Sequence, residues 1–404
     1  MIARPLYMEK IEPFIDAPLA KILTGIRRSG KSTILDAVGE RLIEKGIPEN
    51  KIISAKLDSY EYENIQNGSQ LYHMICDKMT EEGTYYLLLD EVQEITDWEK
   101  AVNSLMESKK ANVFITGSNS KLMSSEISTY LSGRYVVIPV FTLSFKEYIE
   151  FRQSVGEKKD MFVYLNDYIQ VGGFPAIGIG IYSRQEAYTI VRDIYTSVIY
   201  NDITKRNKIR KLEQFERLVK FMFENIGKTF SAQSICDYMK SEKRTLDIET
   251  VYNYVKLLEK AYILYRADRY SIQGKEVMKT QEKYYLADPS LKFAVIGYYD
   301  SAVASMLENI VFLELRRRGY DAYIGNLNGK EVDFVGVRRE EKIYIQVCRQ
   351  IPASENGRSR EIGNLEKIRD HYHKYIVTLD PLAVGNENGI EIVHLADFLL
   401  AEKW

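Results

Sequence analysis

Residues 20–33 read AKILTGIRRSGKST, and this stretch decides the fold of the first third of the chain. An apolar run at Ile22 and Leu23 ends at Gly25, and a helical apolar pattern follows Ser32. The spacing is G-x-x-x-x-G-K-[ST], with a strand before it and a helix after it. We therefore predict a phosphate-binding loop here; the alternative, a chance glycine-rich turn, does not explain the matching flanks.

The residue types in this loop suit a phosphate group. Gly25 and Gly30 can adopt backbone angles that other residues avoid, so the main chain can approach an anion. Amides and the helix dipole favour negative charge at a helix N-terminus. Lys31 adds a positive charge for the β- and γ-phosphates, and Ser32 offers a hydroxyl to Mg²⁺. The residues predicted to bind nucleotide are Gly25, Ile26, Arg27, Arg28, Ser29, Gly30, Lys31, Ser32 and Thr33.

Composition limits the function classes. The chain has 404 residues, 45% of them hydrophobic and 28% charged, which predicts a globular protein of two to four domains. The net charge of −2 predicts no whole-chain attraction to nucleic acid or to a membrane. Three scattered cysteines indicate a reducing compartment and argue against a zinc site. The N-terminal residues carry no signal-peptide pattern, and no apolar run reaches the ~18 residues of a membrane span. We expect a cytoplasmic protein.

An acidic pair follows the second strongly apolar strand. Residues 85–91 read YYLLLDE, which predicts a buried strand that ends at Asp90 and Glu91. We predict that Asp90 is a magnesium ligand together with Ser32, and that Glu91 orients the attacking water. The alternative is an acidic helix cap. A carboxylate that activates water favours hydrolysis over transfer to a small-molecule acceptor.

Strand patterns at residues 52–58, 85–91, 113–116 and 136–140 alternate with helical segments, which predicts a parallel sheet with ligands at the carboxyl ends of its strands. Asn119 follows one of these strands and is our first choice for a group that contacts the γ-phosphate or the water; Thr116 is the second, and an Asn/Ser turn is the alternative. Arg134 is a candidate γ-phosphate sensor or arginine finger, with a surface salt bridge as the alternative. The sequence leaves open whether Arg134 acts within its own chain, across an interface or not at all.

Residues 20–140 resemble an AAA-type P-loop domain (ATPases associated with diverse activities). Three later pieces, LSFKEY at 143–148, YIQVGGFPA at 168–176 and IYTSVIYNDI at 194–203, resemble a subgroup of prokaryotic ATP-binding proteins. In this subgroup a C-terminal domain of unknown function is related in fold to restriction endonucleases. The resemblance implies ATP binding and hydrolysis, with ATP and Mg²⁺ as cofactors.

The middle of the chain reads as helices followed by a hairpin. Residues 143–205 predict a helical lid. Helical patterns at 212–225, 231–239 and 247–260, then strands at 262–270 and 277–286, describe a winged helix-turn-helix, as the resemblance also implies. Double-stranded DNA is then a candidate partner. Its phosphates would contact Lys240, Lys243, Arg244 and the basic run KRNKIRK at 205–211. A winged helix that packs between domains or binds protein is the alternative.

The order of elements after residue 300 resembles the restriction-endonuclease-like fold. The positions that would correspond to its catalytic residues are Glu308, Asp333, Gln346 and Cys348. Gln346 is neutral and Cys348 supplies no fixed charge, so the acidic-x-lysine pattern of an active nuclease is missing. Arg349 would point to the opposite face of its strand. We therefore predict an inactive domain that packs against the ATPase or binds a protein partner.

The predicted fold is α/β: an AAA-type P-loop core at residues 1–142, a helical lid at 143–205, a winged helix-turn-helix at 206–288 and a restriction-endonuclease-like domain at 289–404. The predicted function is Mg²⁺-dependent ATP hydrolysis coupled to a conformational change of the later domains. The alternatives are a nucleotide-gated adaptor on DNA or protein with negligible turnover, and an ATP-dependent nuclease. The sequence leaves the oligomeric state open.

Overall fold

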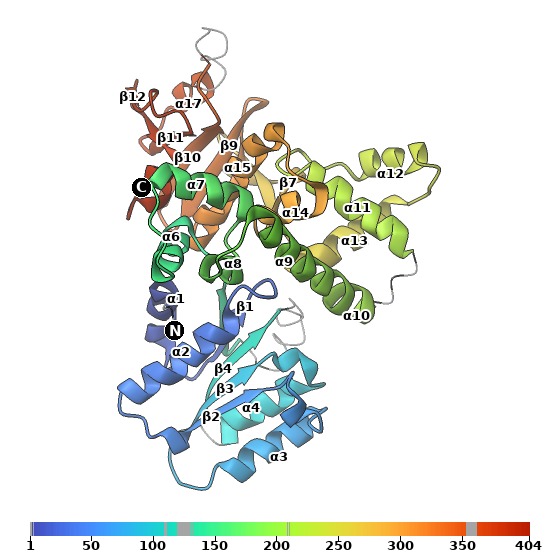
Figure 1. Ribbon diagram of the computed structural model, residues 1–404, viewed down its shortest axis with the longest axis vertical. Coiled ribbons are helices and arrows are strands. Elements are labelled where there is room, and N and C mark those ends of the chain that lie inside the picture. The colour runs from blue at the N-terminus through green and yellow to red at the C-terminus, as the bar shows by residue number, and fades with distance from the viewer. Residues whose placement is uncertain are drawn as a thin grey trace. The chain divides into compact units, whose positions relative to one another are not determined.

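The computed structural model describes residues 2, 4–108, 111–118, 131, 133–207, 209, 211–352 and 362–404 (Figure 1). The chain forms two compact units. The first unit comprises Met1–Phe141 together with Lys260–Tyr262, and the second comprises Thr142–Glu259 together with Ile263–Trp404.

The first unit is built on a parallel sheet of five strands in the order β2-β3-β4-β1-β5. Every residue of β1, β3 and β4 is buried, which explains why these segments read as continuous apolar runs. The predicted strands and their parallel arrangement are confirmed. The strands are β1 (Ala20–Thr24), β2 (Ile52–Lys56), β3 (Tyr86–Asp90), β4 (Asn112–Gly117) and β5 (Tyr135–Pro139).

Helices cover both faces of this sheet. One apolar core joins α1 and α2 to one face, and a second core joins α3 and α4 to the other face. The helical apolar pattern that follows Ser32 predicted α2. The helices are α1 (Pro5–Ile11), α2 (Lys31–Glu44), α3 (Gly68–Lys78) and α4 (Trp98–Ser108), with short 3-10 turns at Glu12–Phe14, Glu49–Lys51, Tyr60–Tyr62 and Val92–Glu94.

The second unit begins with helices, as predicted for the lid. A π-helical turn at Val198–Thr204 and the short helix α10 follow α9, and the three predicted helices α11, α12 and α13 then precede the hairpin in the predicted order. The helices are α6 (Phe145–Ser154), α7 (Met161–Val171), α8 (Pro175–Ile179), α9 (Arg184–Ser197), α10 (Lys205–Asn207), α11 (Leu212–Glu224), α12 (Ala232–Ser241) and α13 (Ile248–Lys260).

The hairpin of β6 (Leu264–Ser271) and β7 (Glu276–Leu286) is not a separate wing. It belongs to an eight-stranded sheet in the order β12-β13-β11-β10-β9-β8-β6-β7, because β6 pairs in parallel with β8. The winged helix-turn-helix predicted over residues 206–288 is therefore not confirmed as a separate domain, because the sheet that contains its hairpin runs across the predicted boundary at residues 288/289. Hydrogen bonding along the other edge of β6 is not visible in local periodicity.

The remaining strands and helices complete this sheet and its cover. Helix α15 packs on β8, β9 and β10. The elements are α14 (Ser290–Ile296), the 3-10 turn Asp300–Ala302, α15 (Val303–Arg317), β8 (Asp321–Leu327), β9 (Lys330–Arg338), β10 (Glu341–Cys348), α17 (Gly363–Glu366), β11 (His373–Thr378), β12 (Gly385–Glu387), β13 (Ile390–His394) and α18 (Leu395–Leu400). Among the described residues, none of the helices combines the length and the apolar character needed to span a bilayer.

Candidate functional site

The phosphate loop leaves β1 at Gly25 and enters α2 at Lys31. Gly25 has φ +150°, and a Cβ on it would lie 2.1 Å from the carbonyl oxygen of Val140, so only glycine fits this close approach. Arg28 has φ +65° and Gly30 has φ +96°, both in the left-handed region. This sequence of backbone angles curls the loop into a concave row of amides at the start of a helix, which is an anion-binding geometry.

Lys31 is the first residue of α2 and is buried. Its Nζ donates to the carbonyl oxygens of Gly25 at 3.0 Å and of Ile26 at 3.1 Å. The ammonium group thus lies within the loop, where a phosphate oxygen can replace one of these carbonyls as its partner.

The other residues of the loop differ in exposure. Arg28 and Thr33 are exposed, and Arg27 and Ser32 are half-buried. Ser29 is fully buried, and its hydroxyl has no hydrogen-bond partner within the described part of the chain. Arg28 is therefore the residue of the loop whose charge is open to solvent or to a ligand.

Asp90 ends β3 beside the loop and is buried. Its carboxylate accepts hydrogen bonds from the hydroxyls of Thr116 and Ser32. Burial raises the pKa of Asp90, and the nearby Glu91 and Asp58 carboxylates raise it further. A hydroxyl and a buried carboxylate surrounded by excess negative charge form an oxygen donor set that fits Mg²⁺. The structure thus brings Ser32 and Asp90 together, as the magnesium site predicted from the sequence requires.

Glu91 has φ +53°, an uncommon conformation for a residue with a side chain. Its backbone N–H donates to the Thr116 hydroxyl oxygen at 3.0 Å. Its buried carboxylate accepts hydrogen bonds from Gln93 and, at 3.3 Å, from the Ser118 hydroxyl. Strained backbone that several hydrogen bonds hold in place is common at functional sites.

Thr116 joins the two acidic residues. Its hydroxyl donates to Asp90 and accepts from the backbone of Glu91, and the side chain is fully buried near the end of β4. Thr116 was our second choice for this strand end. Asn119, the first choice, lies outside the described residues.

Sequence reasoning missed three polar residues of this site: Asp58, Gln93 and Ser118. Asp58 and Ser118 follow the ends of β2 and β4, so the rule that ligands gather at the carboxyl ends of parallel strands could have indicated both. No comparable pattern indicates Gln93, whose place depends on the 3-10 turn at Val92–Glu94.

Arg134 lies at the amino-terminal ends of the strands, whereas the phosphate loop lies at their carboxyl ends. It directly precedes β5, which begins beside Ala20, whereas the phosphate loop follows the end of β1. A strand of five residues spans roughly 15 Å at ~3.3 Å per residue. The Arg134 guanidinium contacts Asn103 at 2.7 Å and Glu107 at 2.6 Å. The prediction of a γ-phosphate sensor within the same chain is therefore wrong, and the salt-bridge alternative describes the contact; a role across an interface stays a prediction.

A second polar cluster lies in the eight-stranded sheet and α15. Asp333 on β9 accepts the N–H of Val347 at 2.8 Å, and its own N–H donates to the Gln346 side chain at 3.4 Å. Lys283 on β7 is buried and lies 2.6 Å from Glu331 and 4.0 Å from Glu308.

The acidic-x-lysine pattern is missing at Gln346 and Cys348, as the sequence analysis states. Lys283 nevertheless brings a lysine into this cluster, from a strand that the sequence pattern does not link to it. Arg349 pairs with Asp300 at the surface, away from the cluster, as expected. Cys348 is half-buried and is not part of a disulfide. Within the described residues, no group of three or more His, Cys, Asp or Glu side chains is placed to hold a metal ion. The domain therefore has an acidic cluster with a lysine but no such metal-binding group in its described part.

Two family models match the chain. An AAA domain matches residues 18–149, which contain the phosphate loop, Asp90 and Glu91. A domain of unknown function matches residues 163–302. The Walker-type ATPase PABY2304 of Pyrococcus abyssi is similar in fold, with a TM-score of 0.51 and 13% identity over 73% of this chain and 96% of that chain.

Two curated relatives match along most of their length. An uncharacterized protein of Haemophilus influenzae is 34% identical over 401 residues, which span 99% of both chains. The uncharacterized protein MJ1544 of Methanocaldococcus jannaschii is 29% identical over 95% of this chain and 87% of its own. The chain therefore belongs to the family of the Haemophilus influenzae protein, a family of P-loop proteins in which an AAA domain precedes a domain of unknown function.

Proposed function

We propose that this protein binds ATP with Mg²⁺ and hydrolyses it. One observation carries the proposal: Lys31, Ser32, Asp90 and Glu91 meet at the carboxyl ends of β1 and β3, beside a loop whose amides suit a phosphate. Membership of a P-loop family supports the nucleotide, and Glu91 supports hydrolysis because transfer to an acceptor needs no carboxylate that activates water.

Each residue then has a chemical role. Lys31 would exchange a loop carbonyl for a phosphate oxygen, and Ser32 and Asp90 would hold Mg²⁺. The metal would neutralise phosphate charge and polarise the γ-phosphoryl group. Glu91 would orient the attacking water, while hydrogen bonds to the Thr116 hydroxyl hold Asp90 and Glu91 in position.

Two variants test these roles. Lys31→Ala should abolish saturable binding of a fluorescent adenine nucleotide, because the loop loses its phosphate charge. Glu91→Gln should bind nucleotide but release phosphate ~10²–10⁴-fold more slowly. Glu63→Gln, an exposed residue of the same unit, is the matched control and should behave as wild type. Equal phosphate release by wild type and Glu91→Gln would remove the assignment of the water-orienting residue.

The proposal includes coupling of turnover to the second unit, which the chain first enters between Phe141 and Thr142. The alternative is an adaptor that binds ATP with negligible turnover. Phosphate release with and without duplex DNA separates the two, since an adaptor shows none in either case.

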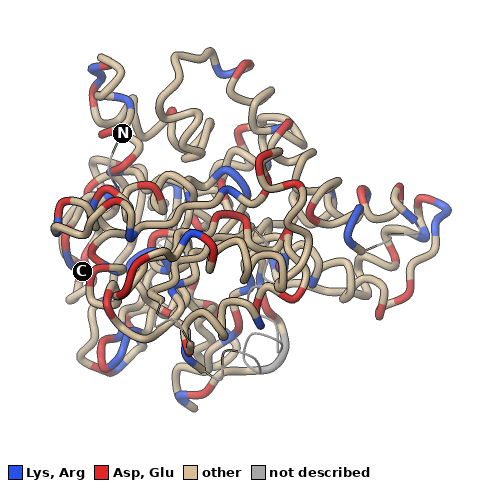
Figure 2. Tube along the Cα trace, turned by 90° about the horizontal axis from the view of Figure 1, so that it is seen from below, with Lys and Arg blue, Asp and Glu red and all other residues tan. Residues whose placement is uncertain are grey.

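Duplex DNA is our proposed partner for α12 and α13. Lys240 on α12, Lys256 on α13 and Lys243 between the two helices are exposed, and Tyr252 on α13 is half exposed. Arg244, in contrast, pairs with Glu213 at 3.1 Å. Figure 2 shows acidic and basic residues interleaved over this part of the molecule. Lys205 and Lys211 of the basic run at 205–211 are exposed as well. These five lysines predict weak, salt-dependent binding whose slope against log[salt] is about −4.5; binding that does not weaken with salt would exclude this contact.

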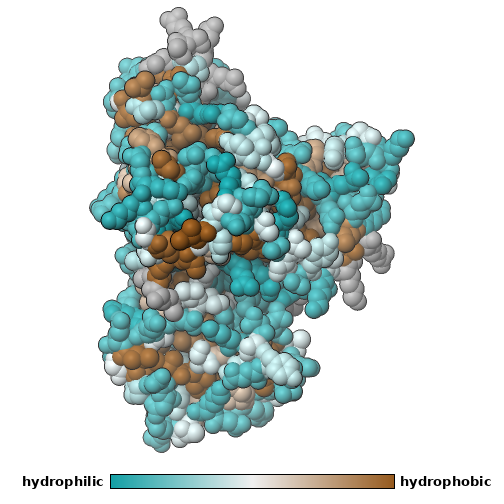
Figure 3. All heavy atoms as spheres, in the orientation of Figure 1, coloured by the Kyte–Doolittle hydropathy of each residue, from teal (hydrophilic) through white to brown (hydrophobic). Residues whose placement is uncertain are grey.

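A protein partner is proposed for the C-terminal part. Leu382 is 95% exposed and Val384 is 50% exposed in the connection between β11 and β12. Figure 3 shows apolar residues at the surface around β12. Nuclease activity is not part of the proposal because Gln346 replaces an acidic ligand and Lys283 is engaged by carboxylates. Plasmid incubated with Mg²⁺ or Mn²⁺ should stay intact; cleavage that is lost in Asp333→Ala would contradict this.

A further inference from the structure

Arg4, just before α1, is buried against the phosphate loop. Only 5% of its surface is exposed. Its Nη1 donates to the carbonyl oxygen of Ser29 at 2.8 Å, and its Nη2 donates to the carbonyl oxygen of Phe141 at 3.0 Å. One side chain therefore links the phosphate loop to Phe141, the last residue of the first segment of the first unit.

Tyr7, one turn into α1, completes this arrangement. The Arg4 guanidinium lies 4.4 Å from the centre of the Tyr7 ring, and Nη2 is 3.4 Å from the Tyr7 hydroxyl. The same hydroxyl accepts the N–H of Phe141 at 2.9 Å. An aromatic face and two carbonyls suit the planar fork of arginine, and a lysine ammonium could not span both carbonyls in this way.

The contact at Ser29 bears directly on the phosphate loop. The carbonyl of Ser29 and the N–H of Gly30 belong to one planar trans peptide, so they point in opposite directions. By holding the carbonyl, Arg4 fixes the direction of the Gly30 N–H, which is one of the amides at the start of α2. The guanidinium charge also favours the peptide dipole in that orientation.

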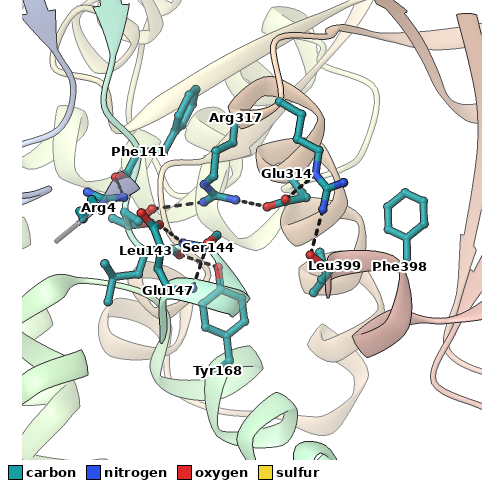
Figure 4. A network of polar contacts seen from close by, with 12 residues as sticks. Arg4, Phe141, Leu143, Ser144, Glu147, Tyr168, Glu314, Arg317, Phe398 and Leu399 are labelled. Carbon is teal, nitrogen blue, oxygen red and sulfur yellow. Dashed lines mark hydrogen bonds and ion pairs between the residues drawn. The ribbon is translucent and has the colours of Figure 1, made fainter. Parts of the chain in front are cut away.

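The contact at Phe141 bears on the exit from the first unit. The preceding residue, Val140, donates to the carbonyl of Thr24 at 2.6 Å, and its carbonyl packs against Gly25. Beyond Phe141, residues of the second unit hold the next two carbonyls: Arg317 donates to Thr142 at 3.2 Å and Tyr168 donates to Leu143 at 2.8 Å (Figure 4).

We propose that Arg4 is a positioning residue for nucleotide turnover: it holds the phosphate loop at Ser29 and the end of the first unit's first segment at Phe141, so that the two move together. The nucleotide part of this inference rests on the proposed function, whereas the clamp itself does not. A shift of the loop on nucleotide binding or release is passed through Arg4 to the peptide that leads into the second unit.

The experiment compares the full chain with Arg4→Ala, Arg4→Lys and the control Arg41→Ala. Arg41 is an exposed arginine of α2 that pairs with Glu12 and Glu44 and does not contact the loop. Amide hydrogen exchange without nucleotide should rise at least tenfold in residues 25–31 and in residues 140–144 for Arg4→Ala. It should stay unchanged in the control.

Kinetics supply the second measurement. Arg4→Ala should turn ATP over ~10–100-fold more slowly, because a loop displaced by about 1 Å can cost that much. Guanidinium chloride at millimolar concentration should restore part of this rate in Arg4→Ala and leave wild type and Arg4→Lys unchanged. A residue needed only for folding would give no such rescue.

Folded Arg4→Ala with unchanged exchange in either segment would overturn the clamp. Should Arg4→Ala not fold, Arg4→Lys and Tyr7→Phe decide the question. Tyr7→Phe removes the acceptor of the Phe141 N–H, so it should raise exchange in residues 140–144 only. A wild-type chain that binds no nucleotide would refute the proposed function, and the exchange comparison would still decide the clamp.

Discussion

The hydroxyl of Thr116 serves two acidic residues at once. It donates to the carboxylate of Asp90 and accepts the backbone N–H of Glu91. Both contacts are buried, so no water can replace the hydroxyl easily. A single side-chain oxygen thus fixes the predicted magnesium ligand relative to the predicted water-orienting residue.

Replacing this hydroxyl by a methyl group tests its importance. In Thr116→Val, phosphate release should fall ~10–100-fold because Asp90 and Glu91 lose their common partner. Nucleotide affinity, measured by fluorescence titration, should change less than about threefold. Thr189→Val on the exposed face of α9 is the control. A Thr116→Val rate equal to that of wild type would show that the hydroxyl only packs.

The side chain of Glu308 on α15 is buried beside a second carboxylate, that of Asp333. Burial and the nearby Asp333 carboxylate raise the pKa of Glu308 to about 8. An unfolded glutamate titrates near ~4.3, so between these values the folded chain holds a proton that the unfolded chain has lost. The free energy of unfolding therefore falls as pH rises through this range, because the unfolded chain must bind a proton in order to fold.

Glu308→Gln should remove this dependence. The variant's gain in melting temperature over wild type should be larger at pH 8 than at pH 5 by at least ~4 °C, because the proton linkage over this range amounts to several kcal/mol. Glu340→Gln, in the turn between β9 and β10 where the side chain is exposed, is the control. A gain of equal size at both pH values would show that Glu308 is ionised throughout.

The connection between α7 and α8 depends on one glycine. Gly172 has φ +74° and ψ −165°, a region that only glycine visits readily. A Cβ there would lie 1.8 Å from the carboxylate of Asp288, which is fully buried and accepts the N–H of Gly173 at 2.8 Å. The Gly-Gly pair is thus a tight turn that packs on a buried carboxylate.

Gly172→Ala should therefore destabilise the second unit by at least ~3 kcal/mol, because both the backbone and Asp288 must move. Gly156→Ala is a matched control: Gly156 has φ +88°, but nothing lies within 4 Å of an added Cβ, so ~1 kcal/mol is expected. Urea unfolding of both variants measures the difference. Equal losses would mean that the Asp288 contact adds no cost.

For the whole molecule, the location of Arg134 limits how copies of the chain can cooperate. Its guanidinium is paired with Glu107 at the amino-terminal ends of the strands, and the phosphate loop lies at the opposite, carboxyl ends. Arg134→Ala should therefore keep ATP turnover per chain within about twofold of wild type where the chain is monomeric, since a screened, exposed ion pair contributes little.

Light scattering after size-exclusion chromatography, with and without a slowly hydrolysed ATP analogue, measures the molar mass. It thus shows under which of these two conditions the chain is a monomer. Glu107→Ala is the control, because it breaks the same pair and keeps the arginine. A larger loss in Arg134→Ala alone, seen only where the chain assembles, would assign the arginine to a neighbouring copy.

By itself, the sequence determined the phosphate loop, the acidic end of β3 and the parallel arrangement of the first sheet. These depend on local spacing: residues 25–32 lie next to one another in the chain, and a continuous apolar run predicts a strand buried on both faces. Helices α11, α12 and α13 followed from periodicity for the same reason.

Only the tertiary structure decided which distant residues meet. Strand order places Thr116 beside Asp90 and Arg134 at the amino-terminal ends of the strands, joins β6 to β8, and brings Lys283 to Glu308. It also brings Arg4 to the phosphate loop. Strand order and pairing arise from the packing of the whole sheet, and neither leaves a periodic signal in the residues that they bring together.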